Sequence, residues 1–158
     1  MYAIVQILGA MAGVGAADYM FDVPVYTWSQ HARAGLPQVF AEGMATFGLL
    51  AVIAGCSRRR PAATPFAVGA YITAAYWFTS STSFANPAVT LARAFTNTFA
   101  GIRLIDVPAF VVGQVLGAAA ATILFRWLVP RETKRGTREG QPAAAFVSSP
   151  ERPSRSLA

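Results

Sequence analysis

The chain contains one cysteine and one histidine among its 158 residues, and both shortages exclude some chemistry. With Cys56 alone, no disulfide can form within the chain, and its place beside a run of arginines favours an inert residue at a helix end. His31 has no second histidine or cysteine nearby to complete a metal site, so we interpret it as a solvated side chain. The sequence therefore predicts neither a bound metal nor another cofactor.

Charged residues are also scarce, at 13% of the chain, whereas hydrophobic residues make up 54%. This composition is typical of a protein that crosses a membrane several times. Four apolar stretches are long enough to cross a bilayer: residues 1–17, 36–55, 64–82 and 107–129. Glu42 is the acidic residue within them, and no nucleophile stands with a base, so we do not expect an enzyme.

Basic residues gather in two places, and these places indicate the orientation of the chain. Residues 58–60 are three arginines, and four of residues 131–138 are lysine or arginine. Because cytoplasmic loops carry an excess of such residues, we place both sites and both termini on the cytoplasmic side of the plasma membrane, with residues 18–35 outside. We interpret residues 131–158 as a disordered basic cytoplasmic tail. The net charge of +6 then reflects topology and lipid contact rather than nucleic acid binding.

The segment SFANPAVTLAR, residues 83–93, starts a helix at the end of an uncharged run. The Asn86 side chain can accept from free backbone N–H groups, and Pro87 suits the first helical position. The pattern predicts a helix from Pro87 to Phe99, ended by Gly101, whose length of about 20 Å is too short for about 30 Å of hydrocarbon. Asn-Pro also opens many soluble helices, but the neighbouring apolar stretches favour a re-entrant half-helix that lines a pore.

Two segments form an internal repeat. Residues 6–12 (QILGAMA) and 114–120 (QVLGAAA) share five identities in seven positions at an offset of 108. Under the topology above, the two copies cross in opposite directions, as in an inverted repeat. By this symmetry, roughly 70 residues that correspond to two spans and a second half-helix have no counterpart in the chain. Chance similarity of Gly- and Ala-rich helices is the alternative, and residues 1–17 could instead be a signal peptide that lacks the usual basic start.

Several segments together resemble the major intrinsic protein family, the aquaporins and glycerol facilitators. They are QILGAMAG in the first stretch, AEGMATFGLL around Glu42, the arginines of residues 58–60, PFAVGAYITAAYW, FANPAVTLAR and GQVLGAAAA. Their order is similar to spans three to six of that family, with its second Asn-Pro-Ala motif. The resemblance implies an all-α membrane protein over residues 1–130, a partial right-handed helical bundle of four transmembrane helices and one half-helix.

The resemblance also implies which residues face a solute. Asn86, Pro87 and Ala88 match the pore motif of the family, in which the asparagine amide donates to a passing oxygen. Where the family normally has an arginine directly after this motif, the chain has Val89. This departure implies a wider and more apolar throat and puts strict water selectivity in doubt.

Two further constriction positions are implied, Ser83 and Tyr76, although the alignment leaves Trp77 and Phe78 open as alternatives for the second. Arg93 lies one helical turn after the valine and could reach the pore mouth. We favour instead an arginine that extends to the membrane interface.

Glu42 is an ionisable residue inside a span, and the resemblance implies that it accepts hydrogen bonds from the backbone of the re-entrant loop. The sequence thus predicts an aquaporin-family channel for water or small neutral solutes such as glycerol and metalloid hydroxides, arsenite among them. Val89 favours the broader solutes, and the resemblance implies a homotetramer. The alternative is a truncated, non-conducting half-channel or an interaction subunit, because the chain starts at Met1 inside a span.

Overall fold

The computed structural model describes residues 1–128, and the tail predicted for residues 131–158 lies outside them. Five α-helices and three short 3-10 turns make up this part of the chain, without a β-strand. The α-helices are α1 (Tyr2–Met20), α2 (Leu36–Arg59), α3 (Thr64–Phe78), α4 (Pro87–Ala92) and α5 (Val107–Leu128), and the turns are Pro61–Ala63, Arg93–Phe95 and Leu104–Asp106. The predicted all-α class is confirmed.

Three helices of the described part are long and apolar enough to cross a membrane: α1, α2, and α5 with the turn before it. The other expected span, residues 64–82, is shorter than predicted because α3 ends at Phe78. Thr79 continues in an extended conformation, and its hydroxyl donates a 2.7 Å hydrogen bond to the carbonyl oxygen of Ala75. The 15 residues of α3 extend about 22 Å. The chain from Thr79 onward therefore belongs to the loop that leads into α4.

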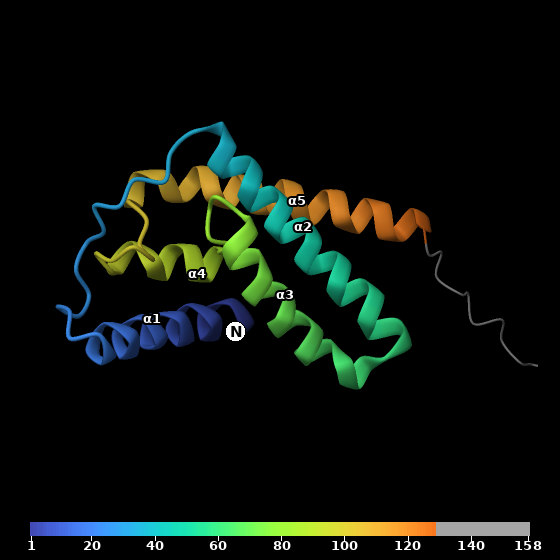
Figure 1. Ribbon diagram of the computed structural model, residues 1–158, viewed down its shortest axis with the longest axis horizontal. Coiled ribbons are helices and arrows are strands. Elements are labelled where there is room, and N and C mark those ends of the chain that lie inside the picture. Colours follow the sequence, from blue (N-terminus) through green and yellow to red (C-terminus); the bar gives the residue numbers. More distant parts are fainter. Residues whose placement is uncertain (129–158) are drawn as a thin grey trace, which may run out of the picture.

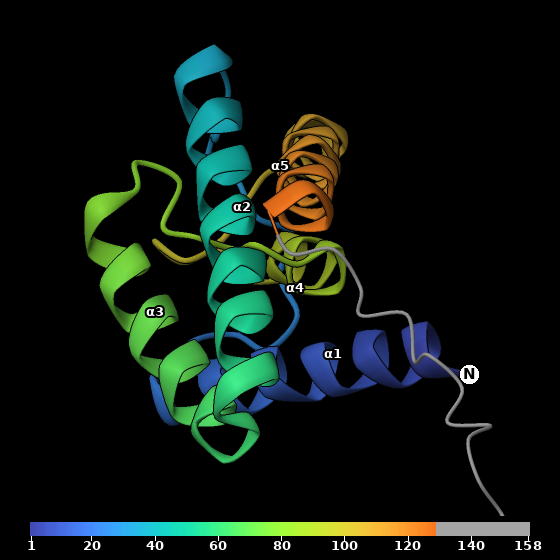
Figure 2. The same ribbon diagram turned by 90° about the vertical axis from the view of Figure 1, so that its right-hand side faces the viewer.

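The most extensive packing joins α2 and α5 (Figures 1 and 2). Gly113 and Gly117 on α5 permit this close approach. A Cβ atom at position 113 would lie 2.6 Å from the carbonyl oxygen of Val39, and one at position 117 would overlap the carbonyl oxygen of Gly43. Small residues at a spacing of four thus bring the backbones of two membrane helices into contact.

The first copy of the repeat lies on α1 and has no such neighbour among the described residues. A Cβ atom at Gly9, the counterpart of Gly117, would meet nothing within 4 Å. Gln6, the counterpart of Gln114, donates a 3.1 Å hydrogen bond to Tyr2 on its own helix. α1 packs against α4 (Figure 1). Its most apolar stretch is only 6% buried, against 33% for that of α5, so one face of α1 is left open.

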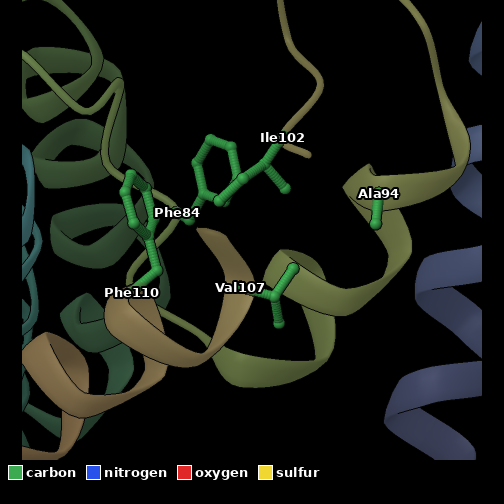
Figure 3. Packing of buried hydrophobic residues seen from close by; sticks show 5 residues of the cluster. All are labelled: Phe84, Ala94, Ile102, Val107 and Phe110. Atoms are coloured by element: carbon green, nitrogen blue, oxygen red, sulfur yellow. The ribbon is translucent and has the colours of Figure 1, made fainter. Parts of the chain in front are cut away.

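A small buried core lies where the loops on either side of α4 meet the start of α5 (Figure 3). The ring of Phe84 packs edge to face against Phe110, with 5.4 Å between the ring centroids. Ala94, Ile102 and Val107 complete the cluster. Because these residues precede the half-helix, follow it, or belong to α5, the core fixes both ends of α4 against a membrane-spanning helix.

Candidate pore lining and constriction

The half-helix α4 begins as its local sequence predicts. Asn86 is the N-cap in an extended conformation, and its Oδ1 accepts a 2.8 Å hydrogen bond from the backbone N–H of Ala88. Pro87 occupies the first turn, where a missing donor costs nothing. The cap occupies Oδ1, and the Nδ2 amide of Asn86 makes no hydrogen bond within residues 1–128.

The half-helix is shorter than predicted. After α4, the 3-10 turn ends at Phe95 instead of Phe99. Thr96 is extended, and its hydroxyl donates a 2.6 Å hydrogen bond to the carboxylate of Asp18 on α1. This contact with a distant part of the chain draws residue 96 out of the helix, which is about 15 Å long.

The carboxylate of Glu42 holds the loop before α4. The residue is fully buried, at 0% exposure. Its Oε1 accepts from the hydroxyl of Ser81 at 2.7 Å and the N–H of Phe84 at 2.8 Å, and its Oε2 accepts from the N–H of Ala85 at 2.9 Å. Ser83 and Ala85 adopt left-handed φ angles of 48° and 49°. Such conformations turn successive N–H groups of a loop toward one anion.

Gln114 extends this network to α5 and α4. Its Nε2 donates to the Glu42 carboxylate at 2.8 Å and to the hydroxyl of Thr90 at 2.7 Å. Thr90 donates in turn to the carbonyl oxygen of Asn86 at 2.9 Å. The network therefore joins three helices around the start of the half-helix. The sequence did not predict a role for Gln114 or Thr90, although the presence of a glutamine in both copies of the repeat is a signal that could have pointed to Gln114.

A second buried charge, Arg33, comes from the connection between α1 and α2 and is 3% exposed. Its Nε, Nη1 and Nη2 donate to the carbonyl oxygens of Gly101, Ser81 and Phe99 at 2.7, 2.9 and 2.8 Å. Burial, and after it the positive charge of Arg93, lower the pKa of Arg33 from its ordinary value. The loop that was expected outside is thus tied to the segments before and after α4. Sequence reasoning missed this role, because the partners lie 48 to 68 positions away.

Arg93 lies over an aromatic ring inside the protein, so its predicted extension to the membrane interface is wrong. Its guanidinium carbon lies 4.3 Å from the centroid of the Phe84 ring, and that of Arg33 lies 4.9 Å from the same centroid. Attraction between a cation and an aromatic face stabilises such contacts. The Nη1 of Arg93 is buried and has no hydrogen-bond partner among the described residues.

A cavity of about 540 Å³ is lined by α1 on one side and by α4 and the segment after it on the other, and we call it the α1–α4 cavity. Asp18 lines it from α1, and Val89, Arg93 and Thr96 line it from the opposite side. The rest of the lining is mostly apolar, so Asp18 and Arg93 are its two charged residues. Val89 also packs against the core around Phe84. Val89, the residue that departs from the family pattern, therefore lies between this core and the α1–α4 cavity.

The end of α3 carries three candidate aromatic residues. Tyr76 is half-buried, whereas Trp77 is 84% and Phe78 is 62% exposed. Ser83 is 5% exposed, and its hydroxyl has no hydrogen-bond partner in the described part of the chain. No three histidine, cysteine, aspartate or glutamate side chains come together as a metal site within residues 1–128.

This geometry defines a class of protein: a multi-pass helical membrane protein in which a buried carboxylate and its partners hold a capped half-helix between spanning helices. The comparison of sequences is more specific. The model of the Major intrinsic protein family matches residues 36–151, and the chain belongs to this family. The family predicted from the sequence is therefore confirmed.

The chain is also similar to the aquaglyceroporin AqpS of Rhizobium meliloti (strain 1021), with 55% identity over 128 residues. The match covers 81% of this chain and 55% of the relative, so the chain spans about half the length of that protein. No solved structure matches the chain.

Proposed function

We propose that this chain forms part of the wall of a membrane channel for the passive passage of water and small neutral solutes, including glycerol and metalloid hydroxides such as arsenite. In this proposal the protein is a channel and not an enzyme. The observation that carries it is the half-helix start, where Asn86 caps α4 through Oδ1 and its amide donor has no hydrogen-bond partner within residues 1–128. Membership of the family and the likeness to an aquaglyceroporin support the class of solute.

The motif of Asn86, Pro87 and Ala88 is the point that each solute passes. The Asn86 amide donates to a solute oxygen, and the free N–H groups of the first helical turn carry partial positive charge that disfavours cations. Glu42 supports this site, because its hydrogen bonds to the preceding loop fix the position of the donor. A donor already held in place loses little entropy when a solute arrives.

Val89, Ser83 and Tyr76 form the constriction of the proposed pore. The two methyl groups of Val89 replace the charge and the donors that an arginine would supply. The throat is then wider and more apolar, which favours solutes of the size of glycerol over water alone. The position of Val89 beside the α1–α4 cavity supports this reading of its role.

A complete pore needs a second wall, and the open face of α1 is where we place it. Gln114 and Gly117 on α5 contact Glu42 and Gly43 of α2, whereas their counterparts on α1 have no such partner among the described residues. We propose that α1 takes a helix with a similar pair, a carboxylate followed by a small residue. A further segment of the protein or a partner chain supplies it. The proposed assembly is a homotetramer in the plasma membrane with cytoplasmic termini.

A second candidate function is a non-conducting half-channel or an interaction subunit. The open face of α1 favours it, because the described helices do not enclose a solute path on that side. Non-helical backbone such as the loop before α4 would then need other protein around it to satisfy its polar groups in the membrane. The two candidates differ in solute flux.

The deciding experiment measures water and glycerol flux in proteoliposomes. Two proteins are compared: the chain alone, and a chimera in which the chain replaces its matched segment in the Rhizobium aquaglyceroporin. Glycerol flux through the chimera supports the channel, and absence of flux from both proteins supports the non-conducting subunit. Val89→Arg in the conducting protein is expected to lower the ratio of glycerol to water permeability, and an unchanged ratio contradicts the constriction.

A further inference from the structure

Arg93 is the one charged residue between Pro87 and Phe95. No ion pair joins it to a carboxylate within residues 1–128, and its Nη1 is buried without an acceptor. The guanidinium contacts the face of the Phe84 ring. Within residues 1–128 no guanidinium nitrogen of Arg93 makes a hydrogen bond, and the residue lines the α1–α4 cavity, so the group is expected to bind an acceptor that enters this cavity.

The nearby carboxylates are already occupied. Glu42 accepts from four donors, which are two backbone N–H groups, a serine hydroxyl and the Gln114 amide. Asp18, the other charged residue that lines the α1–α4 cavity, accepts from the Thr96 hydroxyl at 2.6 Å and from the N–H of Tyr26 at 3.3 Å. The guanidinium of Arg93 therefore remains available to a solute.

The second arginine on the same ring, Arg33, has hydrogen-bond acceptors for its guanidinium group. Arg33 directs Nε, Nη1 and Nη2 to three backbone carbonyl oxygens, and its donors are used in holding the chain. Of the two guanidinium groups beside Phe84, only that of Arg93 combines a lining position with an unpartnered donor. The role in solute contact thus falls to Arg93 and the structural role to Arg33.

We propose that Arg93 is a specificity-determining residue of this channel: its guanidinium donates to the oxygens of a neutral solute passing Val89, and its fixed charge excludes cations. This inference rests on the proposed channel function. Residues 89 and 93 lie one helical turn apart and line the same cavity. The valine leaves room at the throat while the arginine keeps the throat positive. This combination suits a small uncharged solute with several hydroxyl groups, which can accept from the guanidinium while it passes.

The test uses Arg93→Met and Arg93→Lys, because both substitutions keep a long apolar stem against Phe84. Methionine removes the charge and the donors, and lysine keeps the charge. Arg126→Gln is the matched control, since Arg126 is exposed near the end of α5, away from the cavity lining. Each variant is introduced into the chain alone and into the chimera with the Rhizobium relative. Glycerol and water fluxes are measured by light scattering, and methylammonium entry at acidic pH measures cation leak.

We expect Arg93→Met to raise methylammonium entry by about tenfold or more, because removal of a unit charge a few ångströms from the path removes its repulsion. The ratio of glycerol to water flux falls in the same variant. Arg93→Lys keeps the low cation entry, and Arg126→Gln behaves as the wild type. Against a conducting wild type, unchanged cation entry and an unchanged flux ratio in Arg93→Met overturn the role of Arg93 alone. A wild type that conducts neither solute, alone or in the chimera, overturns the proposed function and this inference with it.

Discussion

The amide of Gln114 on α5 lies 2.8 Å from the carboxylate of Glu42 on α2, and both side chains are buried at the point where the half-helix begins. The same amide donates to Thr90 on α4, so one side chain joins three helices. The position of the Asn86 donor therefore depends on contacts between spanning helices as well as on its own cap.

Glu42→Gln is expected to lower the free energy of unfolding by about 3 kcal/mol, because the amide offers one acceptor oxygen where the carboxylate offers two to buried donors. Thermal unfolding in detergent, followed by circular dichroism, measures the loss. Thr122→Val is the control, since the Thr122 hydroxyl is exposed and bonds only within its own helix. Equal stability of Glu42→Gln and wild type would show that the carboxylate does not support the loop.

The two copies of the repeat predict opposite results for the same substitution. Gly117→Ala places a methyl group on the carbonyl oxygen of Gly43 and is expected to destabilise the protein by about 1 to 3 kcal/mol. Gly9→Ala meets open space and leaves stability equal or slightly higher, since alanine favours helix over glycine by up to about 1 kcal/mol. The same unfolding measurement compares them. In the chimera, Gly9→Ala is expected to become destabilising, and its continued neutrality there would contradict a helix packed on α1.

Asn86 has a structural role and a proposed solute-facing role, and two substitutions separate them. Asn86→Ala removes the cap and is expected to cost about 1 kcal/mol of stability. Asn86→Asp keeps an oxygen for the Ala88 N–H but replaces the amide donor by a negative charge. We expect Asp to preserve stability and to reduce the exclusion of cations in the flux assay. Cation exclusion that survives in the Asp variant would place the solute path elsewhere.

Arg33→Lys is expected to increase the mobility of the segments around α4, although the substitution retains the positive charge. Lysine cannot direct donors to the three carbonyl oxygens that the planar guanidinium reaches. Hydrogen–deuterium exchange should therefore become faster in residues 96–102, whereas residues 113–121 of α5 serve as the internal reference. Unchanged exchange in residues 96–102 would show that the arginine does not hold this segment.

Local chemistry made the beginning of the half-helix predictable, and distant contacts made its end unpredictable. The Asn-Pro start needs only its own side chain and the next N–H groups, so Asn86 and Pro87 could be placed from the sequence. The end at Phe95 depends on Thr96 reaching Asp18, 78 positions away. The early end of α3 was missed because the prediction used the length of the uncharged run, and residues 79–82 are uncharged although they lie in a loop.

The buried arginines show the same limit. Composition and spacing favour the membrane interface for Arg93 and suggest no role for Arg33, and only the folded chain brings both onto Phe84. The family, by contrast, was predictable, because six short segments carry it in order. Its assignment did not depend on how any one side chain is oriented.

The most direct test of the account is the glycerol permeability of liposomes that contain the chimera of this chain and the Rhizobium aquaglyceroporin. Protein-free liposomes and liposomes with only the unmatched part of the relative are the controls. Glycerol entry is expected to be several-fold faster than in both controls, and to become slower relative to water entry after Val89→Arg. Glycerol entry equal to the controls, from a chimera whose circular dichroism shows a folded helical protein, would contradict the claim that this chain builds a pore for neutral solutes.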